Sequence, residues 1–263
     1  MIITSRQNPK IKVVMQLRKR KARDELRLML IEGYEELTMA VKSSVAIQQV
    51  FYCPELMLEA AQVALLGQIA HAEHIEVSRD IFEKIAYRES PDGWLAVAPE
   101  LSARLANVQL PPSKAALVII CESVEKPGNL GAILRTADAV GADAVIAADP
   151  ITDWSNPNIV RASKGAVFSV PVASAATEEL LAWLKANNIT ILAATPDTNT
   201  QYTSVDLQKS VAIAVGTEKY GLTSKWFDAA EHKVRIPMKG KIDSLNVATS
   251  AAIIAYEVLR QRG

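Results

Sequence analysis

The strongest constraint on the fold is a series of short, continuous apolar segments in the second half of the chain. They are ALVIIC (116–121), AVIAA (144–148), ITILAA (189–194), VAIAV (211–215) and VRIP (234–237). Stretches long enough for a helix separate them. Strands that are apolar on both faces and alternate with helices are typical of a parallel sheet that helices cover on both sides. This half of the chain is therefore predicted to be an α/β domain.

A boundary separates this domain from an N-terminal part. The segment PELSARLANVQLPPSK (99–114) is short of large apolar side chains and has Pro111-Pro112 near its end, a pair that is extended and stiff. The predicted organisation is an N-terminal domain over residues 1–103, a linker over 104–113 and a second domain over 114–263.

Helices and strands are mixed within residues 1–103. Helices are expected over 10–31, 55–70 and 79–86, and strands over 50–52, 75–77 and 94–98. The N-terminal part is therefore predicted to be a small α/β domain.

The net charge of the 263 residues is zero, but positive charge is concentrated near the N-terminus. Between positions 6 and 27 there are two acidic residues and nine basic ones: Arg6, Lys10, Lys12, Arg18, Lys19, Arg20, Lys21, Arg23 and Arg27. Such a cluster can bind phosphate groups, with an affinity that falls as salt rises. It can equally be a solvated helix face. Charge alone leaves both interpretations open.

The sequence also bears on the cellular location of the protein and on the state of its two cysteines. No apolar run approaches the roughly 18–20 residues that span a bilayer, and the first residues lack the apolar region of a signal peptide. A cytoplasmic protein with no membrane partner is expected. Cys53 and Cys121 stand far apart and are predicted to be buried free thiols.

The residues after the first strand of the second domain argue against several common enzyme classes. In ESVEKPGNLG, Gly128 and Gly131 do not have the spacing of the dinucleotide turn G-x-G-x-x-G. No phosphate loop or G-x-S-x-G nucleophile motif is present. His71 and His74 have no third ligand near them, so no metal is expected. A dehydrogenase, a nucleotide hydrolase and a zinc hydrolase are all disfavoured.

Glycine and polar residues gather in the three segments 126–146, 215–223 and 236–257. The second and third begin at the carboxyl ends of strands, where open α/β sheets bind ligands. In the first, Asn129 is predicted to be the N-cap of a helix. In the third, Ser244 and Asn246 precede an alanine-rich helix, and they could cap it or belong to a site.

These segments resemble, in order and spacing, the three motifs of the SpoU/TrmH family of SPOUT-class methyltransferases. The residues that carry the motifs are Asn129, Gly131 and Arg135; Gly216, Glu218, Gly221 and Leu222; and Ile236, Pro237, Met238, Gly240, Ser244, Leu245, Asn246 and Glu257. The stretch 156–168, with Arg161, is similar to the family's linking segment. Thr217 stands where many members have Asn.

The N-terminal part, with Glu32-Gly33 and Pro91-Asp92-Gly93, is similar to the small ribosomal-protein-like substrate-binding domain of many members. The resemblance implies a parallel-sheet SPOUT domain with a deep trefoil knot, a homodimer whose active sites are completed across the interface, and S-adenosylmethionine as cofactor. The residues implied to bind the cofactor are Thr195, Gly216, Glu218, Gly221, Ile236, Met238, Ser244 and Leu245.

The implied activity is methyl transfer to a ribose 2′-hydroxyl, which makes the substrate RNA. The implied catalytic residues are Asn129, Arg135, Glu218, Ser244 and Asn246, and the implied RNA-binding residues are Arg18, Lys19, Arg20, Lys21 and Arg161. Arg135 would act by lowering the pKa of the hydroxyl or as the base itself. The separate N-terminal domain favours ribosomal RNA, most of all 23S-type RNA. Transfer RNA and a non-catalytic RNA-binding role are the alternatives.

Overall fold

The structure, a computed structural model, describes residues 2–263. These residues form two compact units. The first unit comprises the chain up to Leu101 together with Asp153–Ser169, and the second comprises Ser102–Thr152 and Val170–Gly263. The first unit therefore includes a segment that, in the sequence, lies between two strands of the second unit. The predicted division at residues 104–113 did not anticipate this segment.

The second unit is built on a parallel sheet, as predicted. Within residues 2–263 this sheet has six strands in the order β10-β8-β9-β5-β6-β7, and all neighbouring strands are parallel. The strands are β5 (Leu117–Glu122), β6 (Ala144–Ala148), β7 (Val172–Ala175), β8 (Thr190–Ala194), β9 (Val211–Val215) and β10 (His232–Val234).

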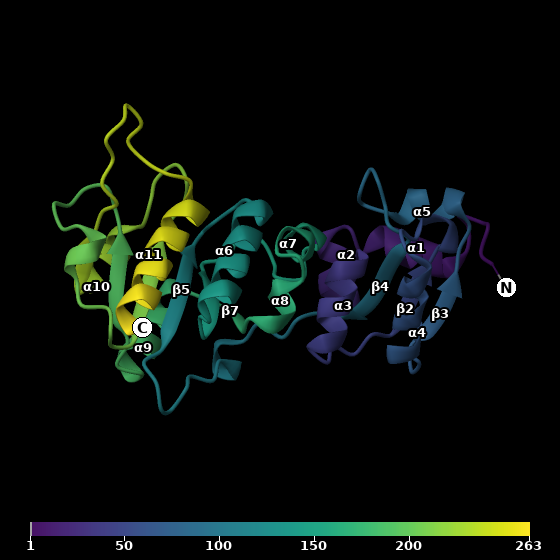
Figure 1. The fold of residues 1–263 in the computed structure, drawn as a ribbon, viewed down its shortest axis with the longest axis horizontal. Helices are drawn as coiled ribbons and strands as arrows, with labels where there is room; N and C mark the ends of the chain where they lie inside the picture. Colours follow the sequence, from purple (N-terminus) through teal and green to yellow (C-terminus); the bar gives the residue numbers. More distant parts are fainter. Residues whose placement is uncertain (1) are drawn as a thin grey trace. The chain divides into compact units, whose positions relative to one another are not determined.

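Helices cover both faces of this sheet. They are α6 (Pro127–Val140), α9 (Thr177–Ala186), α10 (Ser224–Ala229) and α11 (Val247–Arg262), with short 3-10 turns at Leu105–Asn107 and Tyr202–Ser204. Helices α6 and α11 pack against each other on one face (Figure 1). Leu180, Leu184 and Trp226, from α9 and α10, share a buried cluster with Val118 and Ile146 of the sheet.

Two strands of this sheet differ from the prediction. The segment 234–237 was expected to be a strand, but β10 comprises His232–Val234. The next N–H, that of Arg235, donates to the carbonyl of Thr200, which lies outside the strands of the sheet. Strand β7 was not predicted at all. Its sequence VASA has weak strand propensity, and its pairing with β6 decides its conformation.

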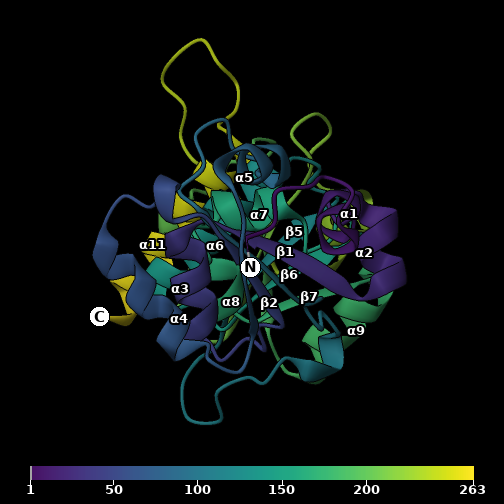
Figure 2. The same cartoon turned by 90° about the vertical axis from the view of Figure 1, so that its right-hand side faces the viewer.

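The first unit contains a mixed sheet with the order β1-β4-β2-β3 among the described strands. Its strands are β1 (Leu28–Glu32), β2 (Gln49–Tyr52), β3 (Glu73–Glu76) and β4 (Trp94–Pro99); its helices are α1 (Pro9–Gln16), α2 (Arg20–Leu26), α3 (Tyr34–Lys42), α4 (Ala64–Gln68), α5 (Arg79–Ile85), α7 (Pro157–Ala162) and α8 (Ala166–Ser169). Figure 2 shows α1 and α3 on opposite sides of β1 and β2.

The helix predicted over residues 10–31 is wrong in its second half. Lys19 is extended, which separates α1 from α2, and Arg27 ends α2 in a left-handed conformation with φ of 55°. Leu28–Glu32 then forms β1, which pairs with Leu95 to Pro99. The partner strand is distant in the sequence, and a local pattern does not contain that pairing.

The helix predicted over residues 55–70 is also wrong for most of its length. Pro54–Leu56 and Ala60–Val63 are 3-10 turns, and only Ala64–Gln68 is α-helical. Glu59 is extended between the two turns. The indole N–H of Trp94 donates to the side chain of Gln62 at 3.3 Å. A tertiary contact therefore stabilises the second of these 3-10 turns.

The segment 153–169 is held in the first unit by polar contacts. The Arg23 guanidinium is 3% exposed and binds the carboxylate of Asp153 at 2.6 Å, and it also donates to the carbonyl of Leu17. The hydroxyl of Ser155 accepts the backbone N–H of Leu101 at 3.0 Å. Arg23 is therefore a structural residue, although it belongs to the basic cluster of the sequence.

We expect Arg23→Ala to lower the free energy of unfolding of the first unit by about 3 kcal/mol, because removing one member of a buried ion pair leaves the other uncompensated. Lys21→Ala, on the same helix, is the control, since its pair with Glu25 spans 3.8 Å and is largely exposed. Urea unfolding measures both. Equal losses for the two variants would contradict the structural role of Arg23.

Candidate active site

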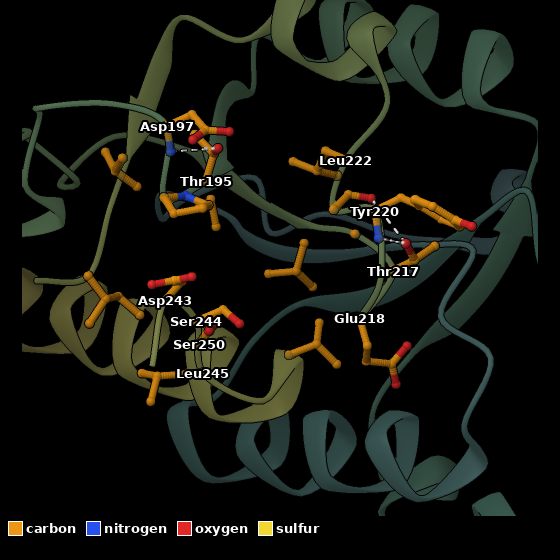
Figure 3. A pocket seen from close by; sticks show the side chains of 18 of the residues that line it. Thr195, Asp197, Thr217, Glu218, Tyr220, Leu222, Asp243, Ser244, Leu245 and Ser250 are labelled. Atoms are coloured by element: carbon orange, nitrogen blue, oxygen red, sulfur yellow. Dashed lines mark hydrogen bonds between the residues drawn. The ribbon is translucent and has the colours of Figure 1, made fainter. Parts of the chain in front are cut away.

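A cavity of about 390 Å³ opens beyond the carboxyl ends of β8, β9 and β10 (Figure 3). This volume is within the range of small-molecule sites, roughly 300–1,000 Å³. Three segments form its walls: residues 194–197 after β8, residues 215–222 after β9, and residues 236–245 together with the start of α11. The last of these segments is the long loop between β10 and α11 in Figure 1.

The residues implied to bind a cofactor come together here. Lining the cavity are Thr195, Gly216, Glu218, Gly221, Ile236, Met238, Ser244 and Leu245. Sequence reasoning missed Asp197, Tyr220 and Asp243, which also line it (Figure 3). The position of Asp197, three residues beyond the end of β8, was the available signal, because ligands bind beyond the carboxyl ends of parallel strands. The cofactor role of the whole set stays a prediction.

The lining combines apolar side chains with charged ones, among which three are acidic and one, Lys219, is basic. Leu222, Ile236 and Leu245 supply apolar surface. Asp197, Glu218 and Asp243 place three carboxylates around the same space (Figure 3). A ligand with a flat apolar part and a positive charge would match this lining in shape and in electrostatics.

The loop after β9 is folded tightly because Gly216 has no side chain. A Cβ atom at this position would collide with the carbonyl group of Gly221. The backbones of Thr217 and Gly221 exchange two hydrogen bonds of 3.0 Å, and the Thr217 hydroxyl accepts the N–H of Tyr220 at 2.9 Å. Thr217 therefore closes the turn with its own side chain, a role that Asn can also fill.

Three predicted catalytic residues from different segments meet beside the cavity. The side-chain amide of Asn129 donates to the carboxylate of Glu218, and its oxygen accepts from the side chain of Asn246 at 3.1 Å. Asn246 is also the N-cap of α11, where its side chain accepts the N–H of Ala248 at 2.9 Å. Asn246 thus serves both as a helix cap and as a member of the site.

The prediction that Asn129 is the N-cap of its helix is wrong. Helix α6 begins at Pro127 with Lys126 as the N-cap residue. Proline is favoured at the first helical position because it has no N–H to satisfy there. Asn129 therefore lies within the first turn, and its side chain contacts two other segments instead of the helix backbone.

Arg135 lies apart from this group. It is exposed on α6, and within residues 2–263 no hydrogen bond or ion pair joins it to Asn129, Glu218 or Asn246. Six residues of α-helix advance roughly 9 Å and leave the two side chains about 120° apart around the helix axis. Ser244 lines the cavity. The catalytic roles of these five residues stay predictions.

The predicted RNA-binding residues all belong to the first unit. Lys19, Arg20 and Lys21 are exposed at the start of α2, and Arg161 is exposed on α7. Arg18 is half-buried, and its guanidinium donates to two backbone carbonyls. Their role in binding RNA stays a prediction.

Both cysteines are buried free thiols, as predicted. Burial raises the pKa of the Cys121 thiol to about 12, so it is protonated at neutral pH and is a poor nucleophile. In the described part of the chain, no group of three or more His, Cys, Asp or Glu side chains could hold a metal ion. None of the described helices is long and apolar enough to cross a membrane.

A parallel α/β sheet, a cavity beyond its strand ends and a second mixed α/β unit define a two-unit ligand-binding protein. The chain belongs to the SpoU rRNA Methylase family, whose sequence profile matches residues 116–256. The profile of the MRM3-like substrate binding domain matches residues 8–96, within the first unit. The resemblance of the three glycine-rich segments to this family is confirmed.

Similar proteins cover almost the whole chain. The 23S rRNA (guanosine(2553)-2′-O)-methyltransferase of Bacillus subtilis is 28% identical over 97% of this chain and 98% of its own length. A crystal structure of an RNA 2′-O ribose methyltransferase is 41% identical, with a TM-score of 0.87 over 100% of this chain and 99% of that one. The AdoMet-bound rRNA methyltransferase from Sinorhizobium meliloti is 30% identical, with a TM-score of 0.88 over 99% and 97%.

Proposed function

We propose that this protein transfers a methyl group from S-adenosylmethionine to a ribose 2′-hydroxyl of 23S-type ribosomal RNA. The observation that carries the proposal is the meeting of Asn129, Glu218 and Asn246, from three separate segments, beside a cavity at the strand ends. Family membership and the named activity of the Bacillus subtilis relative support ribosomal over transfer RNA. Such a substrate would place the protein in the cytoplasm.

The cavity has the chemistry that S-adenosylmethionine requires. Gly216, Ile236 and Leu245 would line the adenosine part, and the carboxylates of Asp197 and Asp243 would attract its positive charges. The tight turn at Gly216 keeps the backbone of residues 216–222 close to the space that the ligand would fill. When bound, this cofactor supplies a methyl group that a positively charged sulfur activates.

The chain's own residues would prepare the 2′-hydroxyl, which is a poor nucleophile while protonated. Arg135 would lower the pKa of this hydroxyl by stabilising the developing alkoxide, and a phosphate or a water would accept the proton. Because an arginine has a pKa above about 12, this role suits it better than that of a base. Asn129 and Ser244 would position Arg135 or the substrate. Asn246 would hold the substrate or the loop before α11, and Glu218 would orient the loop after β9.

The exposed position of Arg135 supports a homodimer in which it completes the site of the partner protomer. Tyr256 and Leu259 on α11 are also exposed, and α11 packs on the helix that carries Arg135. Sedimentation of the full chain as a monomer would contradict the dimer.

We further propose that the second unit contains the deep trefoil knot of the family. We also propose that the first unit binds RNA through Lys19, Arg20, Lys21 and Arg161, with Arg18 adding positive charge.

The direct test is transfer of labelled methyl groups from S-adenosylmethionine to total RNA of a strain that lacks the gene, followed by mapping of the modified ribose. Incorporation at one 2′-oxygen of 23S RNA is expected. RNA from the parent strain is the matched control, because its site is already methylated and should accept no label. Label in transfer RNA would move the assignment to that substrate. Cofactor binding without transfer to any RNA would contradict the proposed reaction.

The double role of Asn246 allows its two contacts to be separated. We expect Asn246→Ala to lose about 1 kcal/mol of stability, because the N-cap of α11 is lost. Asn246→Ser keeps a capping hydroxyl but is too short to reach Asn129. The serine variant should therefore have nearly native thermal stability and the same loss of methyl transfer as the alanine variant. Native activity in the serine variant would show that the contact with Asn129 is dispensable.

A further inference from the structure

The first unit holds an exposed tyrosine with two arginines close to its ring. The Tyr87 side chain is 44% exposed. The guanidinium carbons of Arg18 and Arg161 lie 5.9 and 5.6 Å from the centre of its ring. The Asn158 side chain donates to the Tyr87 hydroxyl at 3.2 Å, and Arg161 donates to Asn158 at 3.4 Å. Residues from two distant parts of the sequence therefore form one polar and aromatic cluster.

The backbone around Tyr87 is firmly anchored. The carboxylate of Glu32 is buried and accepts the backbone N–H groups of Tyr87 at 2.8 Å and Arg88 at 3.0 Å. The Arg88 guanidinium in turn binds Glu36 at 2.5 Å. Gly33 leaves room for this pair, since a Cβ atom there would collide with the Glu36 carboxylate. The backbone that carries the exposed tyrosine is thus hydrogen-bonded to a buried carboxylate.

The two arginines beside Tyr87 differ in how many hydrogen bonds to the backbone hold their side chains in place. Arg18 donates to the carbonyls of Lys84 at 2.9 Å and Ala86 at 2.6 Å, which lie at the end of α5. Its position is therefore set by the protein. Arg161 is exposed, and among the described residues its polar and aromatic contacts are with Tyr87 and Asn158.

The positive charge at Tyr87 is not balanced by an ion pair. No carboxylate lies within 4.0 Å of either Arg18 or Arg161 in residues 2–263, whereas Arg23 is paired with Asp153 in the same unit. Two guanidinium groups held around one ring repel each other, and an anionic ligand would relieve this repulsion. A phosphate beside a base has this charge, and an exposed aromatic–arginine pair offers the base a stacking surface.

We propose that Tyr87, Arg161 and Asn158 form a contact site for an unpaired nucleotide of the substrate RNA. The base stacks against the Tyr87–Arg161 pair, and Arg161 binds the neighbouring phosphate. The bases of a duplex are already stacked within the helix, so this site selects a loop or another single-stranded part of the RNA. It also explains why residues 153–169 belong to the first unit, since they bring Arg161 and Asn158 to Tyr87.

This inference rests on the proposed RNA substrate and is tested with the full-length protein. The probes are a labelled oligouridylate of about 12 nucleotides and an RNA duplex of the same length. Tyr87→Leu should weaken oligouridylate binding about tenfold or more, the usual loss for one stacked base. Tyr87→Phe keeps the ring and should bind nearly as the native protein does. Duplex binding should change little in either variant.

Arg161 is tested through the salt dependence of the same binding. Arg161→Gln should weaken binding and reduce the slope of log K against log salt by about 0.7, the value for one phosphate contact on a single strand. Arg161→Lys should keep the slope. The control is Lys185→Gln, which removes one exposed charge from α9 and should change neither the affinity nor the slope.

Native oligouridylate affinity in both Tyr87→Leu and Arg161→Gln would overturn the inference. So would failure of the native protein to bind oligouridylate, or an equal effect of Tyr87→Leu on single-stranded and duplex RNA. Thermal unfolding shows whether a variant is folded, and Tyr87→Phe and Arg161→Lys remain informative if the larger changes are not tolerated. Cofactor titration separates the two proposals, because a native protein that binds no S-adenosylmethionine would contradict the proposed function and leave the RNA result standing.

Discussion

Replacing Arg135 by alanine should reduce methyl transfer by at least about a hundredfold, the usual effect of losing a group that stabilises a developing oxyanion. S-adenosylmethionine binding should remain nearly native, because Arg135 does not line the cavity. Single-turnover transfer of labelled methyl groups and calorimetric titration of the cofactor measure the two quantities. Lys185→Ala, an exposed cation on α9, is the control and should leave both unchanged.

The same variant tests whether the active site spans two protomers. Arg135→Ala and Glu218→Ala homodimers should each be inactive. A mixed dimer of the two variants would contain one site with both residues intact, and it should regain part of the native activity. Turnover close to native in Arg135→Ala would contradict the role of this arginine. No recovery in the mixed dimer would place Arg135 and Glu218 in the site of one protomer.

Replacing Gly216 by alanine should weaken S-adenosylmethionine binding at least about tenfold. The added methyl group would collide with the Gly221 carbonyl, so the loop over residues 216–222 must move away from the cavity. Overpacking of this kind typically costs about 1–3 kcal/mol. Calorimetric titration of the cofactor gives the change in affinity, and thermal unfolding gives the change in stability.

Gly240→Ala is the matched control for this substitution. Gly240 lies in the segment between β10 and α11, and a Cβ atom there would have nothing within 4 Å. The same chemical change should therefore leave cofactor affinity nearly native. Native affinity in Gly216→Ala would contradict the steric argument. An equal loss in both variants would mean that loop flexibility, not close packing, determines affinity.

Much of the second unit could be predicted because its signals are local. The strands β5, β6 and β9 are short runs of buried apolar residues, and such runs between helices are typical of parallel strands. The glycines and polar residues of the site lie in the segments that follow strand ends. Their convergence on one edge is a consequence of parallel topology, so the location of the cavity could be anticipated without knowledge of its shape.

The first unit was harder to predict because its pairings are distant. The run Leu28–Glu32 continues a helical pattern, yet it is a strand because Leu95 to Pro99 pair with it. The segment 153–169 was assigned to the second domain by its place in the sequence. Its contacts, such as the pair of Asp153 with Arg23, place it in the first unit instead.

The sequence alone specified the periodicity of the elements, the glycines of the tight turns and the residue types of the site, because each depends on a few neighbouring positions. Tertiary structure decided which of these residues meet. Asn129 contacts Glu218 and Asn246 across 89 and 117 positions, and Tyr87 contacts Asn158 across 71. Local propensity acts over a few residues, whereas such contacts depend on how the strands and helices pack, so they are known only once the chain is folded.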